Sequence, residues 1–117
     1  MDRSRSKLRK IESFIRKIVI EKKEIKLRIV HLLGELNKIK KLSQIMSDEL
    51  LKINNQKIYN GYNIRKNMNY SHIVREQLNI SENKIEFLEI EILNLEKELI
   101  SKKHQENLLQ EKAINFR

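Results

Sequence analysis

Few residues in this 117-residue sequence have the type and spacing that chemistry in a protein site requires. The chain has no Cys, which excludes thiolate metal sites, disulfides and cysteine nucleophiles. Its three histidines, His31, His72 and His104, are scattered along the sequence and do not form a recognisable metal cluster. The sequence contains no glycine-rich phosphate loop, paired catalytic carboxylates or nucleophile elbow. We therefore predict a protein that is not an enzyme and that uses no cofactor, metal or small-molecule substrate.

The residues that point to a binding function are basic. The chain has 25 Lys and Arg against 16 Asp and Glu, which gives a net charge of +9. Residues 1–60 carry sixteen basic and seven acidic side chains, whereas residues 61–117 carry nine of each. The excess therefore lies in the first half and predicts an acidic or polyanionic partner. A solvated helix face that only aids solubility is the alternative interpretation.

A repeat of seven residues predicts the element that carries these charges. Positions spaced alternately by three and four are apolar in twelve of fourteen cases, with Lys22 and Ser43 as the exceptions. This spacing places an apolar seam along one side of a helix. We expect this helix over about 4–53. The positions of this first seam are Leu8, Ile11, Ile15, Ile18, Lys22, Ile25, Ile29, Leu32, Leu36, Ile39, Ser43, Met46, Leu50 and Ile53.

The repeat fails in an Asn-rich stretch around Gly61, for which we predict a loop over about 54–63. A second seam then predicts a helix over about 64–115, and ten of its thirteen positions are apolar. A break near Asn79–Asn83, where Ser81 could cap a restarted helix, is the alternative to one continuous helix. The second seam consists of Val74, Leu78, Ser81, Ile85, Leu88, Ile92, Leu95, Leu99, Lys102, Glu106, Leu109, Ala113 and Phe116.

Two seam-bearing helices joined by one loop predict an all-α fold, an antiparallel coiled-coil hairpin that forms a single domain over 1–117. The absence of Pro and the presence of only 2 Gly disfavour the tight turns of a β-rich fold. Reflection about Gly61 sets residue i against roughly residue 122 minus i. The acidic stretch 82–98 then faces the basic stretch 24–40. A parallel homodimer of single helices is the competing fold.

Two further groups of residues lie outside the seams. Ile73, Ile80 and Phe87 repeat every seven residues on a different face of the second helix, and such a stripe indicates an interaction surface. The alternative is that the Ile-rich composition places apolar residues at these positions without any function. Tyr59, Tyr62 and Tyr70 fall in or near the predicted loop. They are either contact residues for a partner or packing residues that close the hairpin.

We expect the protein to be cytoplasmic and not inserted in a membrane. No apolar run approaches the ~20 residues that span a bilayer. The basic start, Met1 to Lys7, is not followed by the apolar core of a signal peptide.

A small, basic two-helix hairpin of this kind resembles the FliJ/YscO/InvI/SpaM-type stalk proteins of type III secretion ATPases, over Leu8 to Phe116. The resemblance implies a stalk that engages and stimulates a hexameric export ATPase and links it to the export gate, at the cytoplasmic face of the bacterial inner membrane. Export chaperones are further implied partners. Carried over, the ATPase contacts are Arg3, Arg5, Lys7, Arg9, Lys10, Arg16, Lys17 and Arg117. The implied gate or partner contacts are Tyr59, Tyr62, Tyr70, Ile73, Ile80 and Phe87.

Two other functions remain open from the residues. A basic coiled coil that binds nucleic acid would show strongly salt-dependent DNA binding, although its basic residues should precede the seam and here they overlap it. A cytoplasmic chaperone or scaffold would hold a client helix on the apolar stripe. In that case Ile73→Asp with Phe87→Asp should abolish client binding and preserve helicity.

Overall fold

The computed structural model describes residues 2–55 and 61–117, with side chains from 3–54 and 65–117. Two α-helices account for this part of the chain except Arg117: α1 (Asp2–Asn55) and α2 (Gly61–Phe116). Residues 56–60, within the predicted loop, lie outside the described residues. Helix α2 runs through Asn79–Asn83 without interruption, so the break considered as an alternative is absent there.

The sequence explains why both helices are long. No Pro interrupts them, and Gly34 is the glycine inside α1. The described backbone has no positive-φ residue that would end a helix early. At the end of α2 the Arg117 N–H donates to the Ile114 carbonyl at 3.3 Å, which satisfies one of the final carbonyls.

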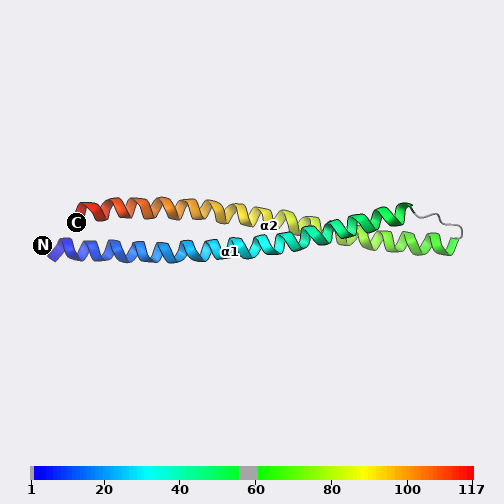
Figure 1. Cartoon of the computed structure of the whole chain (residues 1–117), viewed down its shortest axis with the longest axis horizontal. Coiled ribbons are helices and arrows are strands. Elements are labelled where there is room, and N and C mark those ends of the chain that lie inside the picture. The colour runs from blue at the N-terminus through cyan, green and yellow to red at the C-terminus, as the bar shows by residue number, and fades with distance from the viewer. Residues whose placement is uncertain (1, 56–60) are drawn as a thin grey trace. The chain divides into compact units, whose positions relative to one another are not determined.

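The chain packs as two units, each built from a segment of α1 and a segment of α2. Unit 1 comprises residues 1–32 and 91–117. In this unit the first turns of α1 lie beside the last turns of α2 (Figure 1). Glu12 pairs with Arg117 and Arg28 pairs with Glu91, so the two segments run antiparallel. Its buried apolar residues are Ile18, Ile25, Leu32, Ile92 and Ala113.

Unit 2 comprises residues 33–90. Lys40 pairs with Glu89, and Tyr70 donates to the carboxylate of Glu49, so these segments are also antiparallel. The buried residues differ in kind from those of unit 1, because two serines are among them. They are Leu36, Ser71, Val74, Ser81 and Leu88.

The burial pattern confirms the predicted antiparallel helical hairpin. All fourteen positions of the first seam and all thirteen of the second are buried or half-buried. The second seam also extends further toward the N-terminus of α2 than predicted. Ser71 is buried and Asn67 is half-buried, at spacings that continue the repeat from Val74.

The cross-helix contacts also show how the helices are aligned. The partners of Lys22, Arg28 and Lys40 fall within about one heptad of the positions expected from reflection about Gly61. Arg28 and Lys40 both pair with glutamates of the acidic stretch 82–98. The helices therefore pair within one chain, unlike the competing parallel homodimer. Neither helix, over its described residues, has a stretch long and apolar enough to cross a bilayer.

Candidate partner-binding site

The basic side chains named from the sequence all belong to unit 1. Unit 1 has sixteen Lys and Arg against nine Asp and Glu, a net charge of +7, whereas unit 2 has nine against seven, a net charge of +2. All eight predicted ATPase contacts are exposed. The set consists of Arg3, Arg5, Lys7, Arg9, Lys10, Arg16, Lys17 and Arg117.

Three of these eight residues have a partner within unit 1. The Lys7 ammonium lies 5.9 Å from the centre of the Phe116 ring. Arg117 lies 3.8 Å from the Glu12 carboxylate, and Lys17 lies 4.0 Å from Glu21. Within the described residues, no ion pair or hydrogen bond involves the other five, which leaves their charge available to a partner. These five are Arg3, Arg5, Arg9, Lys10 and Arg16.

Charged residues also interrupt the seam of unit 1, and the structure pairs them across the helices. Lys22 on α1 donates to Glu106 on α2, and both are seam residues with side chains only 19% and 14% exposed. Lys102, another seam residue, lies 2.6 Å from Glu21. The hydrogen bond from Lys102 lowers the pKa of Glu21 below its ordinary value of 4.5. The same bond raises the pKa of Lys102 above 10.5. Both pairs join α1 to α2, so we expect them to favour this register of the two helices.

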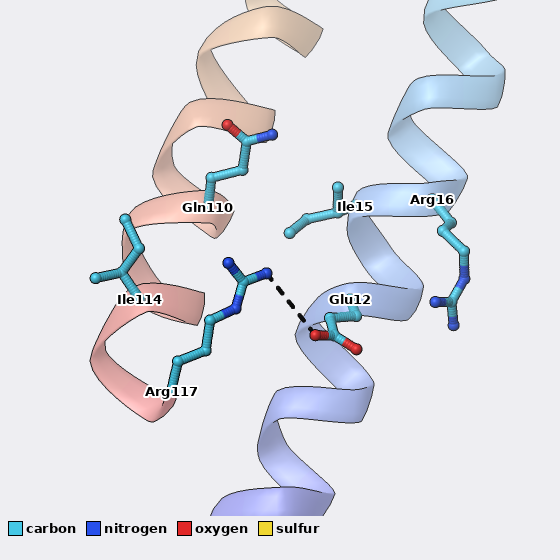
Figure 2. A pocket seen from close by; sticks show the side chains of 6 residues that line it. All are labelled: Glu12, Ile15, Arg16, Gln110, Ile114 and Arg117. Atoms are coloured by element: carbon cyan, nitrogen blue, oxygen red, sulfur yellow. Dashed lines mark ion pairs between the residues drawn. The ribbon is translucent and has the colours of Figure 1, made fainter.

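One flank of this helix pair carries a polar groove. Its volume is about 380 Å³, and its lining includes the ion pair between Glu12 and Arg117. Figure 2 shows Arg117 and Gln110 pointing toward α1, whereas Arg16 points away from α2. A ligand in this groove would have to compete with an existing ion pair. The lining residues are Glu12, Ile15, Arg16, Gln110, Ile114 and Arg117.

The other flank carries an apolar groove of about 420 Å³. The exposed side chains of Phe14 and Leu108 form its banks, over the seam residues Ile18 and Leu109. Lys112 adds a positive charge to the lining. This arrangement can hold an apolar group next to an anionic one. The lining residues are Phe14, Ile18, Gln105, Leu108, Leu109 and Lys112.

The predicted gate or partner residues in unit 2 are exposed where the structure describes them. Ile73, Ile80 and Phe87 all face solvent, and Phe87 is 66% exposed. Tyr70 is also exposed, and its bond to the Glu49 carboxylate raises the pKa of the phenol above 10.0. Tyr59 lies outside the described residues, as does the side chain of Tyr62.

Sequence reasoning missed the groove and the pairing of the charged seam residues. Phe14 lies four residues before Ile18, and Lys112 lies four residues after Leu108, so helical spacing was an available signal. It could not show that Phe14 and Leu108 line one groove, because that depends on the alignment of two helices. Likewise, Lys22 and Glu106 were visible as exceptions to the repeat but not as partners.

No three His, Asp or Glu side chains gather as a possible metal site in the part of the chain that the structure describes. His72 lies 3.1 Å from Glu76, one turn along α2. The site is therefore a set of exposed cations beside an apolar groove. Comparison with known proteins adds nothing to it, because no protein-family model, no curated protein and no solved structure matches this chain.

Proposed function

We propose that this protein is a non-enzymatic coiled-coil stalk of a type III secretion apparatus, and that unit 1 engages and stimulates the hexameric export ATPase. The observation that carries the proposal is the segregation of charge, +7 in unit 1 against +2 in unit 2. Five exposed cations of unit 1 have no described partner, and they are suited to acidic groups of an ATPase ring.

The stalk needs no reactive group for this function. A single two-helix stalk inside a ring of six subunits presents different side chains to different subunits. Unequal contacts give the subunits unequal free energies, which biases their nucleotide states and favours sequential hydrolysis. The seam keeps the two helices paired while the stalk contacts the subunits of the ring. The ion pair between Lys22 and Glu106 keeps them in register.

Unit 2 supplies the contact to the export gate in this proposal. Ile73, Ile80 and Phe87 repeat every seven residues and are exposed, which suits the apolar face of a partner helix. Tyr70 adds an aromatic side chain with a hydroxyl. The protein then acts at the cytoplasmic face of the inner membrane, and export chaperones are further partners.

Charge reversal at unit 1 tests the proposal. We expect the variant with Arg5, Arg9, Lys10 and Arg16 all changed to Glu to lose stimulation of ATP hydrolysis by the purified export ATPase. A matched control changes the net charge equally in unit 2. It carries Glu at Lys38, Lys41, Lys66 and Arg75, all exposed and without a described ion pair.

Far-UV circular dichroism should show the same helicity for both variants, and the control should stimulate as the native chain does. Equal stimulation by the unit 1 variant and the native chain would contradict the proposal. So would a native chain that leaves the ATPase rate unchanged at saturating concentration.

A further inference from the structure

The apolar groove of unit 1 exposes large apolar side chains to water, which is unfavourable in free energy. Phe14 is 57% exposed and Leu108 is 47% exposed, on opposite banks of a groove of about 420 Å³. Its floor is formed by Ile18 and Leu109, which also belong to the seam. The apolar part of its lining is a strip to which both helices contribute, and exposed apolar strips indicate contact surfaces. A partner that buries the exposed side chains of Phe14 and Leu108 would therefore bind with a favourable contribution to the free energy.

Cations stand on both banks of this groove. On α1, Lys10 and Lys17 lie four residues before and three residues after Phe14, on the same side of the helix. On α2, Lys112 lies four residues after Leu108 and lines the groove itself. No ion pair involves Lys10 or Lys112 within the described residues, and Lys17 lies 4.0 Å from Glu21. The apolar strip is thus bordered by positive charge on each side.

The shape and charge together define the ligand. A groove between two antiparallel helices accepts the apolar ridge of a third helix. Residues that flank this ridge would meet Lys10, Lys17 and Lys112, so acidic side chains are complementary there. We propose that the groove of Phe14, Leu108 and Lys112 binds an acidic amphipathic α-helix of a partner protein.

The polar groove on the other flank does not have this character. There the ion pair between Glu12 and Arg117 is part of the lining, so an acidic helix would have to compete with the carboxylate of Glu12 for Arg117. The two flanks of unit 1 therefore differ in what they accept, although the same two helices form both. The groove of Phe14 and Leu108 instead combines apolar side chains with Lys112, which has no ion pair within the described residues.

A second copy of this chain is the competing occupant. Its stretch 82–98 has six Glu against two Lys and exposes Phe87 and Ile90. Binding of that stretch to the groove would bring together chains that each carry a net charge of +9, whether in a reciprocal dimer or in a head-to-tail assembly. Repulsion between these like charges opposes such self-association. We therefore assign the groove to a different protein and treat self-association as an outcome of the test.

A designed peptide tests the proposal with the whole chain. The probe is a fluorescein-labelled helix of three heptads with Leu on one face, Glu on both flanks and Ala elsewhere. Two control peptides have the same composition in scrambled order, or Lys in place of Glu. Fluorescence anisotropy at physiological salt measures the dissociation constant. We expect the probe to bind at least ~10-fold more tightly than either control.

Matched variants locate the binding. Phe14→Ser and Leu108→Ser should each weaken binding of the probe ~10-fold, whereas Ile20→Ser, at a residue of α1 that is equally exposed, should not. Lys112→Glu should weaken binding, whereas Lys97→Glu, with the same change in charge on α2, should not. Far-UV circular dichroism verifies that each variant is folded. The use of both banks keeps the test valid if one variant loses helicity.

Four results would overturn the proposal. One is equal binding of the probe and the scrambled peptide, and another is equal loss in Phe14→Ser and Ile20→Ser. A third is insensitivity to Lys112→Glu. The fourth is sedimentation showing concentration-dependent oligomers of the native chain that Phe14→Ser abolishes, because the groove would then hold a second copy. None of these measurements involves an ATPase, so the inference can fail or hold independently of the proposed function.

Discussion

Units 1 and 2 are built from the same two helices, yet their seams differ in chemistry. The seam of unit 1 contains charged side chains that pair across the helices, Lys22 with the seam residue Glu106 and Lys102 with Glu21 beside the seam. The seam of unit 2 contains uncharged polar residues instead, of which Ser71 and Ser81 are buried. The hydroxyl of Ser43 in unit 2 is buried without a hydrogen-bond partner among the described residues.

This difference between the two seams predicts different mechanical behaviour of the two units. Ion pairs within a seam disfavour slippage, since a shift of register would leave charges unpaired at a poorly hydrated position. Small polar residues contribute little apolar burial, so they permit local opening. Unit 1 should therefore hold the register, and unit 2 should open more readily. The units also differ in net charge, +7 in unit 1 against +2 in unit 2, which is the basis of the proposed acidic partner.

The largest effect is expected from breaking the charged seam. Lys22→Glu places two carboxylates together at side chains that are mostly buried, and we expect a loss of about 2 kcal/mol in the free energy of unfolding. Urea denaturation followed by circular dichroism measures it. Lys23→Glu makes the same charge change at an exposed neighbour and should cost little.

The double variant Lys22→Glu with Glu106→Lys should recover most of the lost stability, because it restores an opposite-charge pair. A double variant no more stable than Lys22→Glu alone would show that the pair does not hold the register.

A smaller effect is expected at Gly34, the first glycine of the chain and part of unit 2. A Cβ built on Gly34 meets no atom within 4 Å, so Ala fits without strain. Gly34→Ala should raise the free energy of unfolding by about 1 kcal/mol through lower backbone entropy in the unfolded chain. Thermal unfolding monitored by circular dichroism tests this. A lower midpoint would imply that the exposed Gly34 makes a contact that the structure does not show.

Removal of the unpartnered hydroxyl in unit 2 should stabilise that unit specifically. Ser43→Ala should raise the free energy of unfolding by about 0.5–1 kcal/mol, since it removes a buried unsatisfied group and adds helix propensity. Ser101→Ala at an exposed site controls for propensity alone. Hydrogen exchange with mass spectrometry should show slower exchange in residues 33–90. Slower exchange confined to unit 1 would contradict the assignment of the weak point.

The charged seam should also make unit 1 sensitive to pH at both extremes. The pKa of Glu21 is lowered, so its pair with Lys102 contributes stability above pH 4.5 and loses it as the pH falls through the lowered pKa. The pKa of Lys102 is raised, so this contribution persists below pH 10.5 and disappears as the pH rises past the raised pKa. Glu21→Gln should therefore lower stability between about pH 5 and pH 10 and change it little outside that range.

Urea denaturation of the native chain and Glu21→Gln across this pH range measures the difference. Glu24→Gln, at an exposed neighbour without a described ion pair, is the control. A difference that does not change with pH would mean that Glu21 acts through packing and not through its charge.

The smallest effect concerns the tyrosine of unit 2. The bond from Tyr70 to the Glu49 carboxylate favours the protonated phenol and raises its pKa above 10.0. Glu49→Gln should lower that pKa toward its ordinary value. The tyrosinate absorbance of native and Glu49→Gln chains, each corrected by subtracting a Tyr70→Phe counterpart, measures the shift. An unchanged titration would indicate that the two side chains do not meet in solution.

Much of the fold follows from local sequence because helical pairing depends on a short repeat. Every predicted seam position is buried or half-buried, since spacings of three and four place residues on one side of a helix whatever the partner is. On α2, however, the seam of unit 2 was predicted only from Val74 onward. Ser71 and Asn67 carry no apolar signal, although both lie on the same side of α2.

The candidate site was less predictable, because its grooves depend on the alignment of the two helices and not on a local repeat. The excess of positive charge in the first half of the chain is a property of composition, and it indicated an acidic partner directly. Phe14 and Leu108 each looked like a scattered apolar residue, because their significance depends on which turn of α2 lies beside which turn of α1.

The sequence by itself determined that two long helices form, which face of each is buried, and that positive charge gathers near its start. These properties depend on neighbours a few residues apart. Only the tertiary structure decided that Lys22 meets Glu106, and that Phe14, Leu108 and Lys112 share one groove. Such contacts join residues more than eighty positions apart, and the energy that selects them comes from packing and charge pairing summed along both helices.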